Sequence, residues 1–552
     1  MINNQLPKQF AHPYKFNPEF KKSAVYFSME FAIDQALKTY SGGLGFLAGS
    51  HMRSAYQLKQ NLIGIGILWK FGYYDQVRNT DNSMTPQFRE KMYNFLEDTG
   101  IRYQIEIGGQ AVWVAAYFLP PHVFGTIPMF FLTTDTEGND MSTRAISYRL
   151  YDADASLKIS QSILLGKGGA MLLDELNYAP EIYHLNEAHA LSAAFHLYNK
   201  LGSVEALRKK MVFTTHTPEE AGNEKHDINH LYSLDFFDGL SMEEIRKISG
   251  IKDNVFNHSL VALRLSHKSN GVSKLHGEVS RKMWGHYEGI CKITHVTNAQ
   301  NNLYWADKQL EKARLKGDKK TIASRKLELK NPLFQVVADQ TGKIFKPEVF
   351  TLVWARRFAG YKRADLITRD AERFGRLMRN SKYPIQIIWA GKPYPFDAPA
   401  IHTFNHLHYL SHLYPQNMAV LTGYELGLSK LLKDGSDAWL NNPVVTREAS
   451  GTSGMTAAMN GSVNVSTDDG WVCEFAKNRE NCFIVPVADD SNDWQRDSED
   501  MNNLLDMLEN EILPMYYDQP EKWQQIVLNS MNDVNAFFDS DRMAAEYYQK
   551  VY

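Results

Sequence analysis

The chain is 552 residues long, and its composition excludes several classes of protein. Hydrophobic residues make up 44% of it, aromatic residues 12% and charged residues 22%, which are the proportions of a folded globular protein and exclude intrinsic disorder. Sixty basic and sixty-three acidic residues nearly balance, without the basic excess that binding to a nucleic-acid backbone requires. We therefore expect about two to four domains, or two large ones, and no nucleic-acid partner.

Three cysteines, Cys291, Cys473 and Cys482, are too few for a disulfide framework, and none has the CxxC spacing of a metal site. We expect no metal centre and a reducing, cytoplasmic compartment. The N-terminal segment lacks the apolar stretch of a signal peptide. Three prolines and a glycine interrupt the apolar residues 111–132 and would break a membrane-spanning helix, so this segment predicts two buried strands joined by a turn and no membrane partner.

Short apolar segments of strand length recur along the chain and alternate with helical stretches. This alternation is typical of βαβ units and predicts an α/β protein with parallel sheets. The charged segment 304–330 predicts exposed helices, with a basic binding patch as the alternative, and residues 502–552 predict terminal helices that pack on the body. The strand segments are residues 24–27, 62–68, 211–215, 349–354 and 385–390.

Three glycines, Gly42, Gly43 and Gly45, lie within five residues after the first predicted strand. Glycines let the backbone come close to a ligand, and a helix that follows them would aim its N-terminal N–H groups at an anion. A tight structural turn would have the same sequence, so both interpretations stand.

Four cations lie within eight residues after the predicted strand 349–354: Arg356, Arg357, Lys362 and Arg363. Open α/β sheets bind ligands at the carboxyl ends of their strands, and arginine and lysine hold phosphate groups. The pattern predicts a site for a phosphate or a pyrophosphate. Ordinary surface charge is the alternative.

The segment REASGTSGM precedes another predicted helix. Its small residues Ser450, Gly451 and Thr452 could form a nest for a phosphate or for sugar hydroxyls. The carboxylate of Glu448 beside them could accept hydrogen bonds from sugar hydroxyls. A capped helix without a ligand is the alternative.

Two segments with histidines follow predicted strands in the first half of the chain: HLNEAHA, with His189, and TTHTPEEAG, with His216. A histidine and a carboxylate near a strand end can do acid–base chemistry, whereas a single buried histidine is usually a satisfied core residue. Taken together, the two segments predict one shared cleft.

In this order, the segments resemble the α-glucan (glycogen, starch and maltodextrin) phosphorylase family, particularly its short bacterial form. The matching stretches include VYFSMEFAIDQALKTYSGGLGFLAG, HLNEAHA, FTTHTPEEAG, SNGVSKLHGEVSRKMW, ARRFAGYKRADL, DAWLNNP and EASGTSGM. The resemblance implies a GT-B fold, in which two Rossmann-like domains face each other across a deep cleft. The implied segments are an N-terminal Rossmann-like domain over 1–300, a helical connection over 301–345, a C-terminal Rossmann-like domain over 346–500 and helices over 501–552 that pack back on the body.

The resemblance also implies roles for individual residues. His189 corresponds to the histidine that hydrogen-bonds the glucosyl ring, and Asn298 to a sugar-contacting asparagine. Arg357 and Lys362 correspond to the phosphate-site cations, and Glu448 belongs to the loop that binds glucose hydroxyls and the cofactor phosphate. We expect these five residues to be catalytic. The expected cofactor-binding residues are Gly42, Gly43, Gly45, Arg356, Ser450, Gly451, Thr452 and Thr456.

One position departs from the family pattern. The family loop reads GTSGMK or GTGNMK, and its lysine forms a Schiff base with pyridoxal phosphate (PLP), but the residue after Met455 is Thr456. A hydroxyl cannot form an imine, so covalent anchoring of PLP is excluded at this position. Lys430, Lys433 and Lys477 are close in sequence but lie outside the motif. The segments TNAQN and GKPYP also depart from the family's TNGVH and GKAHP-like segments, which indicates an altered donor site.

Three functions are compatible with this combination. The first is a retaining glucosyltransferase that phosphorolyses α-1,4-glucans to glucose 1-phosphate, with PLP bound without an imine or with no cofactor. The second is a PLP-independent transferase, similar to glycogen synthase, that uses a nucleotide-diphosphate glucose and stabilises the leaving diphosphate with Arg357 and Lys362. The third is a catalytically silent glucan-binding protein.

We favour an active transferase of the phosphorylase type, because a silent protein has no chemical need for cations aimed at an anion. The expected partners are an α-glucan or maltooligosaccharide and a sugar phosphate or nucleotide sugar. Because members of the family are commonly dimers, a second copy of the chain is a further expected partner.

Overall fold

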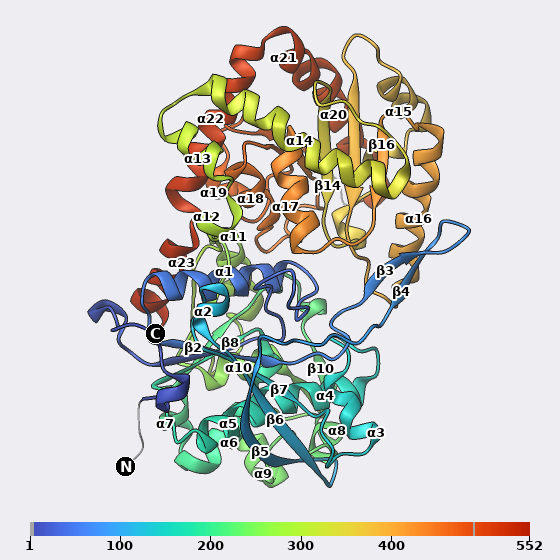
Figure 1. Cartoon of the computed structure of the whole chain (residues 1–552). Helices are drawn as coiled ribbons and strands as arrows, with labels where there is room; N and C mark the ends of the chain where they lie inside the picture. Colours follow the sequence, from blue (N-terminus) through green and yellow to red (C-terminus); the bar gives the residue numbers. More distant parts are fainter. Residues whose placement is uncertain (1–4, 490–491) are drawn as a thin grey trace. The chain divides into compact units, whose positions relative to one another are not determined.

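The computed structural model describes residues 5–489 and 492–552, which form two compact units. The first unit comprises Met1–Tyr74, Phe88–Asn301 and Ser540–Tyr552, and the second comprises Asp75–Gln87 and Asn302–Asp539. Each unit is built on a largely parallel sheet with helices (Figure 1), so the α/β class predicted from the sequence is confirmed. No helix in the described residues is long and apolar enough to cross a membrane.

The sheet of the first unit has nine strands among the described residues, in the order β13-β12-β9-β8-β1-β2-β7-β6-β5. All neighbouring pairs are parallel except β7–β6 and β6–β5 at one edge, because β6 runs opposite to the other strands. From β1, the strands β2 and β7 follow toward one edge of the sheet, whereas β8, β9, β12 and β13 follow toward the other edge. The pair of β1 and β8 is therefore a topological switch point. The strands are β1 (Ala24–Phe27), β2 (Leu62–Ile67), β5 (Glu97–Ile107), β6 (Gln110–Leu119), β7 (Met129–Thr133), β8 (Ile182–Asn186), β9 (Met211–Thr214), β12 (Lys268–Gly271) and β13 (Lys292–His295).

The apolar segment 111–132 forms the antiparallel pair β6 and β7, which confirms the prediction of two strands. Their connection contains the short helix α2 (Pro121–Phe124), which ends at Gly125 in the left-handed region. The other helices and short strands of the first unit are α1 (Gly43–Gln57), α3 (Met141–Arg144), α4 (Ala155–Ile163), α5 (Gly169–Glu175), α6 (Ser192–Leu201), α7 (Val204–Arg208), α8 (Ile228–Ser233), α9 (Met242–Ser249), α10 (His258–Leu265), α11 (Lys274–Trp284), β10 (Lys225–Asp227), β11 (Val255–Asn257) and α23 (Ser540–Glu546).

The last residues of the chain complete the core of the first unit. Met543, Tyr547, Val551 and Tyr552 are buried in one hydrophobic cluster with residues of β1 and β2. The Tyr552 hydroxyl lies 2.7 Å from His184 Nδ1, so its polar end is also satisfied. Burying these side chains removes several hundred Å² of apolar surface from water, since aromatic residues bury about 150–250 Å² each.

The sheet of the second unit has six strands among the described residues, all parallel, in the order β16-β15-β14-β17-β18-β19. In chain order this is the doubly wound arrangement, and its switch point lies between β14 and β17. The strands are β14 (Phe350–Ala355), β15 (Ile385–Ala390), β16 (Met418–Leu421), β17 (Ala438–Asn441), β18 (Val463–Ser466) and β19 (Phe483–Ile484). The helices are α12 (Asn302–Trp305), α13 (Lys308–Leu315), α14 (Lys319–Thr341), α15 (Ala371–Met378), α16 (Ala398–Leu413), α17 (Leu426–Gly435), α18 (Ser453–Met459), α19 (Val472–Phe475), α20 (Asp493–Met507), α21 (Leu513–Asp518) and α22 (Pro520–Phe537).

The hairpin of β3 (Asp75–Arg78) and β4 (Met84–Gln87) also belongs to the second unit. The side chain of Gln76 donates to the carbonyl of Gly391 (2.9 Å) and accepts from the amide of Gly423 (3.0 Å). Arg78 donates to the carbonyl of Val420 (2.7 Å). The hairpin therefore satisfies backbone groups at the carboxyl ends of β15 and β16.

The charged segment 304–330 forms α12, α13 and the first half of α14, but the prediction of exposed helices holds for only one face of α14. Lys330 is fully buried, with its Nζ 2.6 Å from the carboxylate of Asp437. Lys326 is buried too and donates to the carbonyls of Asp434 and Asn460. Buried lysines need such partners, and a run of charge in the sequence does not reveal them.

Candidate functional site

Two clusters of polar residues lie at the two switch points. In the first unit, Glu30 follows β1 and binds the glycine loop: its carboxylate accepts from the Ser41 amide (2.7 Å), the Ser41 hydroxyl (2.9 Å) and the Gly42 amide (3.1 Å). The Tyr151 hydroxyl donates to the same carboxylate at 2.7 Å. The Tyr151 ring lies 6.0 Å, centroid to centroid, from the imidazole of His189. We call Glu30, Ser41, Gly42, Tyr151 and His189 the Glu30 cluster.

The glycines of this loop have different structural requirements. An added Cβ on Gly45 would lie 2.6 Å from Cβ of Tyr40 and 2.9 Å from Oε2 of Glu30, whereas one on Gly42 would meet no described atom within 4 Å. Packing therefore requires glycine at position 45, which is a structural reason for this glycine that needs no ligand. Helix α1 begins at Gly43. The roles of Gly42 and Gly43 toward a donor phosphate stay predictions.

The two histidine segments lie side by side, because β8 and β9 are parallel neighbours. His216 Nε2 lies 2.7 Å from Oδ1 of Asn186, and the Glu187 carboxylate accepts from the amide of His216 and from the hydroxyl of Thr217 (3.1 Å). Burial raises the pKa of Glu187, and nearby His189 opposes that shift. A carboxyl whose pKa is raised toward neutral pH is suited to proton transfer.

His189 and Asn298, the predicted sugar-contacting residues, each carry a buried polar atom that is unsatisfied. Nδ1 of His189 and Oδ1 of Asn298 have no hydrogen-bond partner within residues 5–489 and 492–552. The backbone of Asn298 is held in place, because its backbone amide donates to the carbonyl of Val272 (2.9 Å). Buried polar atoms are rarely left unpaired in folded proteins, so both atoms fit a role in binding a polar ligand.

In the second unit, the switch point brings Arg356, Lys362 and Glu448 together. Arg356 follows β14 and its Nη2 lies 2.6 Å from Oε2 of Glu448, while Nζ of Lys362 lies 2.8 Å from the same oxygen. Burial alone would raise the pKa of the Glu448 carboxyl, but the two cations outweigh it and lower the pKa to about 2. Glu448 is therefore an anion at any physiological pH and can only accept hydrogen bonds.

Asp469 holds the loop that carries Glu448. Its carboxylate accepts from the amide of Glu448 (2.9 Å) and from the amide of Gly470 (2.8 Å). Burial raises the pKa of Asp469 to about 7, and the charge of Glu448 adds to the shift. We call Arg356, Lys362, Glu448, Ser450 and Asp469 the Glu448 cluster.

The structure pairs Lys362 with Arg356, whereas the sequence analysis paired it with Arg357. Neighbouring side chains on an extended segment point to opposite sides: Arg356 is buried and Arg357 is exposed. The role of Arg357 as a phosphate-site cation stays a prediction. In the loop, Gly451 has a φ of +87°, a conformation that favours glycine, and Ser450 and Thr452 are buried beside it.

Two hydrogen-bond donors in the Glu448 cluster lack partners. Nη1 of Arg356 and Oγ of Ser450 are buried, and neither meets an acceptor in the described part of the chain. A guanidinium and a hydroxyl that are buried without acceptors fit a bound anion such as a phosphate group.

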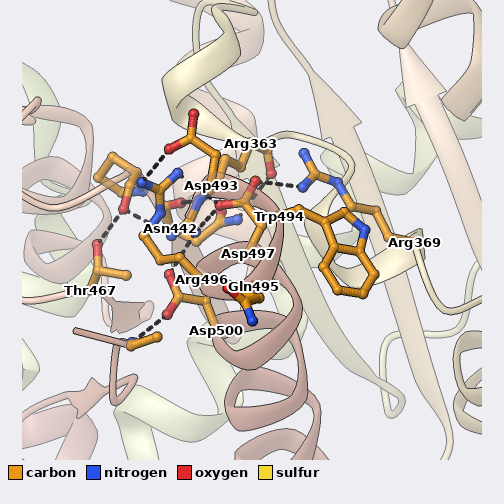
Figure 2. Close-up of polar contacts among 12 residues, drawn as sticks. Arg363, Arg369, Asn442, Thr467, Asp493, Trp494, Gln495, Arg496, Asp497 and Asp500 are labelled. Carbon is orange, nitrogen blue, oxygen red and sulfur yellow. Dashed lines mark hydrogen bonds and ion pairs between the residues drawn. The ribbon is translucent and has the colours of Figure 1, made fainter. Parts of the chain in front are cut away.

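Arg363 fixes the segment that carries Lys362 (Figure 2). Its guanidinium donates to the carbonyls of Asn442 (3.0 Å) and Pro443 (3.1 Å), which follow β17, and to the carboxylates of Asp497 (2.9 Å) and Asp500 (2.6 Å) on α20. The Asn442 side chain donates back to the carbonyl of Arg363 at 3.0 Å. This network, which we call the Arg363 clamp, joins the segments after β14 and β17 at the switch point.

Comparisons with known proteins agree with this arrangement. A family model described as carbohydrate phosphorylase matches residues 307–503. The maltodextrin phosphorylase of Thermococcus litoralis is 30% identical over 594 aligned positions, which cover 97% of this chain and 71% of that protein. The chain belongs to the α-glucan phosphorylase family. The glycogen phosphorylase of Aquifex aeolicus is 28% identical over 98% of the chain, and an uncharacterized protein of Methanocaldococcus jannaschii is 46% identical over 96% of it.

Membership of this family raises the question of PLP, and the residue after Met455 does not fit its covalent attachment, because a threonine forms no imine. Thr456 is buried in α18, and its hydroxyl donates to the carbonyl of Ser453 at 3.0 Å within its own helix. The three lysines that are near in sequence are all engaged: Lys430 donates to the carbonyl of Trp305, Lys433 lies over the Trp305 ring, and Lys477 pairs with Asp533. No imine forms at Thr456, and we assign no reaction step to PLP.

The part of the chain that the structure describes has no group of three or more His, Cys, Asp or Glu side chains that could hold a metal ion.

The sequence analysis did not identify Glu30, Asp469 or the role of Arg363. Glu30 had a usable signal, because it follows a predicted strand and precedes the glycine loop. Asp469 lies in the turn after β18, where an acidic residue is common in any protein. Its bond to the Glu448 amide links residues 21 positions apart, so the sequence pattern carried no signal for it.

Proposed function

We propose that this member of the α-glucan phosphorylase family transfers glucosyl units between an α-1,4-glucan and phosphate, and that it does so without a Schiff-base cofactor. The family supports the reaction type. The observation that carries the proposal is the Glu448 cluster at the switch point, where two cations meet a carboxylate beside unpaired donors.

The chemistry of the cluster suits this reaction. In phosphorolysis a phosphate oxygen bonds to the anomeric carbon while the glycosidic C–O bond breaks, and the departing glucan oxygen takes a proton from the phosphate. Arg356 and Lys362 would bind the phosphate and stabilise its charge, and Arg357 would add a third cation. Glu448 stays ionised because its pKa is about 2, so it would orient glucose hydroxyls by accepting their hydrogen bonds.

We propose that the unsatisfied atoms of His189 and Asn298 hydrogen-bond the glucosyl unit. Both atoms are buried and have no partner among the described residues, and an imidazole or an amide can hydrogen-bond a sugar hydroxyl. A site that hydrogen-bonds hydroxyls rejects analogues that lack them, because its buried polar atoms would then stay unpaired.

A second candidate function is transfer from a nucleotide-diphosphate glucose, and Thr456 favours it because such donors need no PLP. The similarity to phosphorylases over nearly the whole chain weighs against it. The third alternative, a silent glucan-binding protein, offers no account of the cations.

The test is an assay of the purified full-length protein with maltoheptaose and inorganic phosphate, with and without added PLP. Glucose 1-phosphate is expected under both conditions and at similar rates. If product requires PLP, the cofactor-independent part of the proposal is wrong. If no product forms under either condition while ADP-glucose or UDP-glucose lengthens the glucan, the second candidate replaces it.

The cytoplasmic location and a homodimer stay predictions.

A further inference from the structure

We propose that Trp471 is an anion-binding residue, whose indole N–H donates a hydrogen bond to a phosphate group held by the Glu448 cluster. The inference rests on the proposed function for the identity of that cluster as a phosphate site. Trp471 itself follows the turn of Asp469 and immediately precedes α19, and it is fully buried.

The ring edge that bears the N–H faces the loop of the Glu448 cluster. An added Cβ on Gly451 would lie 3.5 Å from Cδ1 of Trp471, and one on Gly454 would lie 3.0 Å from its Cζ2. The indole nitrogen lies between these two carbons along the same edge, so it is directed at residues 451–454. The Trp471 amide donates to the carbonyl of Ser450 at 2.9 Å, which fixes the residue against this loop.

Packing holds the ring in this orientation. Its centroid lies 4.6 Å from that of Phe475 and 4.9 Å from that of Phe538, the latter at an interplanar angle of 80°. Two aromatic neighbours leave the indole little freedom to turn its N–H toward another acceptor.

The indole nitrogen has no hydrogen-bond partner among the described residues, and neither have Nη1 of Arg356 and Oγ of Ser450. The same added Cβ on Gly451 would lie 3.7 Å from Nη2 of Arg356, so the guanidinium and the indole flank one glycine. Oδ1 of Asn464 lies beside Gly454, but it too has no partner among the described residues and so bonds none of these donors. Three buried donors around a single loop fit one acceptor that bonds to all of them. A phosphate group has three or more acceptor oxygens and the opposite charge to Arg356.

Inorganic phosphate and a phosphate ester share this chemistry. The experiment therefore measures binding to the full-length protein for inorganic phosphate, glucose 1-phosphate and PLP in separate titrations, by calorimetry and by tryptophan fluorescence. The test variant is Trp471→Phe, which removes the N–H and keeps an aromatic ring. The control is Trp439→Phe, because Trp439 also has a buried indole nitrogen without a partner in the described chain but lies on β17 in the apolar core.

We expect Trp471→Phe to weaken binding of inorganic phosphate about tenfold, the effect of losing one hydrogen bond to a charged group, while Trp439→Phe changes it less than about twofold. In the phosphorolysis assay Trp471→Phe should raise KM for phosphate more than it lowers kcat. If Trp471→Phe fails to fold, Ser450→Ala removes the adjacent donor and should weaken phosphate binding to a similar extent.

Unchanged phosphate affinity in Trp471→Phe would overturn the inference, as would an equal loss in Trp439→Phe or the absence of phosphate binding in the unmodified protein. PLP could bind the unmodified protein more tightly than inorganic phosphate does and lose this affinity in Trp471→Phe. That result would show that the site binds a phosphate ester and would uphold the inference. If phosphate binds and the variant weakens it but no glucose 1-phosphate forms, the proposed function fails and the role of Trp471 stands.

Discussion

Glu448 is buried between two cations, so its removal affects stability as well as activity. Glu448→Gln keeps the shape of the side chain but leaves Arg356 and Lys362 without their shared carboxylate. Removing one partner of a buried ion pair costs about 3–5 kcal/mol. We expect Glu448→Gln and Lys362→Met each to lower the free energy of unfolding by several kcal/mol, measured by urea denaturation.

The double variant Lys362→Met/Glu448→Gln gives the matched comparison. Because the two residues share one hydrogen bond of 2.8 Å, the loss in the double variant should be smaller than the sum of the two single losses. Strictly additive losses would show that the contact is not formed in solution. The phosphorolysis assay on the same proteins should show kcat/KM reduced by about 100-fold or more in each.

Asp469 makes stability depend on pH in a direction that can be measured. Its pKa is about 7 in the folded protein, against 3.8 for a free aspartate side chain, so the folded state binds the proton more tightly. The stability that this group contributes is therefore complete below about pH 3.8 and is lost as the pH rises through 7. Asp469→Asn cannot titrate.

We expect the difference in unfolding free energy between the wild type and Asp469→Asn to favour the wild type more at pH 5 than at pH 8. The upper bound of this change is about 3 kcal/mol, because two units separate pH 5 from the pKa of about 7 and each unit corresponds to 1.36 kcal/mol. Taking the difference cancels the titration of Glu448, whose pKa of about 2 places its own effect below pH 4.5. A difference that is constant between pH 5 and 8 would contradict the shifted pKa.

Helix α20 supports the phosphate-site segment through the Arg363 clamp, which joins residues about 130 positions apart in the chain. We expect Arg363→Met to lower the unfolding free energy by about 3–5 kcal/mol, because it leaves the buried carboxylate of Asp500 without its cation. Arg363→Lys should recover only part of this loss, since an ammonium cannot reach four acceptors in a fixed plane. Hydrogen exchange in the peptide that contains Lys362 should rise in Arg363→Met.

Arg369→Met is the control for this prediction. Arg369 also pairs with Asp497, at 2.6 Å, but its side chain is 38% exposed, and exposed ion pairs contribute about 0–1 kcal/mol. Equal destabilisation by Arg363→Met and Arg369→Met would show that burial does not set the strength of the clamp.

Local patterns were enough to locate several strands, among them β1, β2, β9, β14 and β15, because a short apolar segment followed by small or charged residues is visible in the sequence. They could not show that Arg356 and not Arg357 faces Glu448, since a shift of one residue turns a side chain to the other face. They also could not show the buried lysines of α14. The partners of those lysines, among them Asp437, are distant in sequence.

The chain passes between the two units at residues 74–75, 87–88, 301–302 and 539–540, so neither unit is one continuous segment. The last residues complete the core of the first unit, and the β3–β4 hairpin supplies Gln76 to the second. Domain boundaries predicted as continuous ranges of the sequence cannot describe these interrupted units. A hairpin of thirteen residues carries no sequence signal for the unit on which it packs. The folding of each unit therefore depends on residues that are remote in the chain.

Gln76→Ala tests this dependence. The substitution removes the bonds to the Gly391 carbonyl and to the amides of Gly423 and Tyr424, and buried backbone groups that lose their partners cost about 1–3 kcal/mol each. We expect faster hydrogen exchange in residues 418–424, more than 340 positions away, and a lower melting temperature. Ser83→Ala is the control, because the Ser83 side chain bonds only to Asp81 and Asn79 in the hairpin among the described residues. Faster exchange at 418–424 in both variants, or in neither, would show that Gln76 does not hold the ends of β15 and β16.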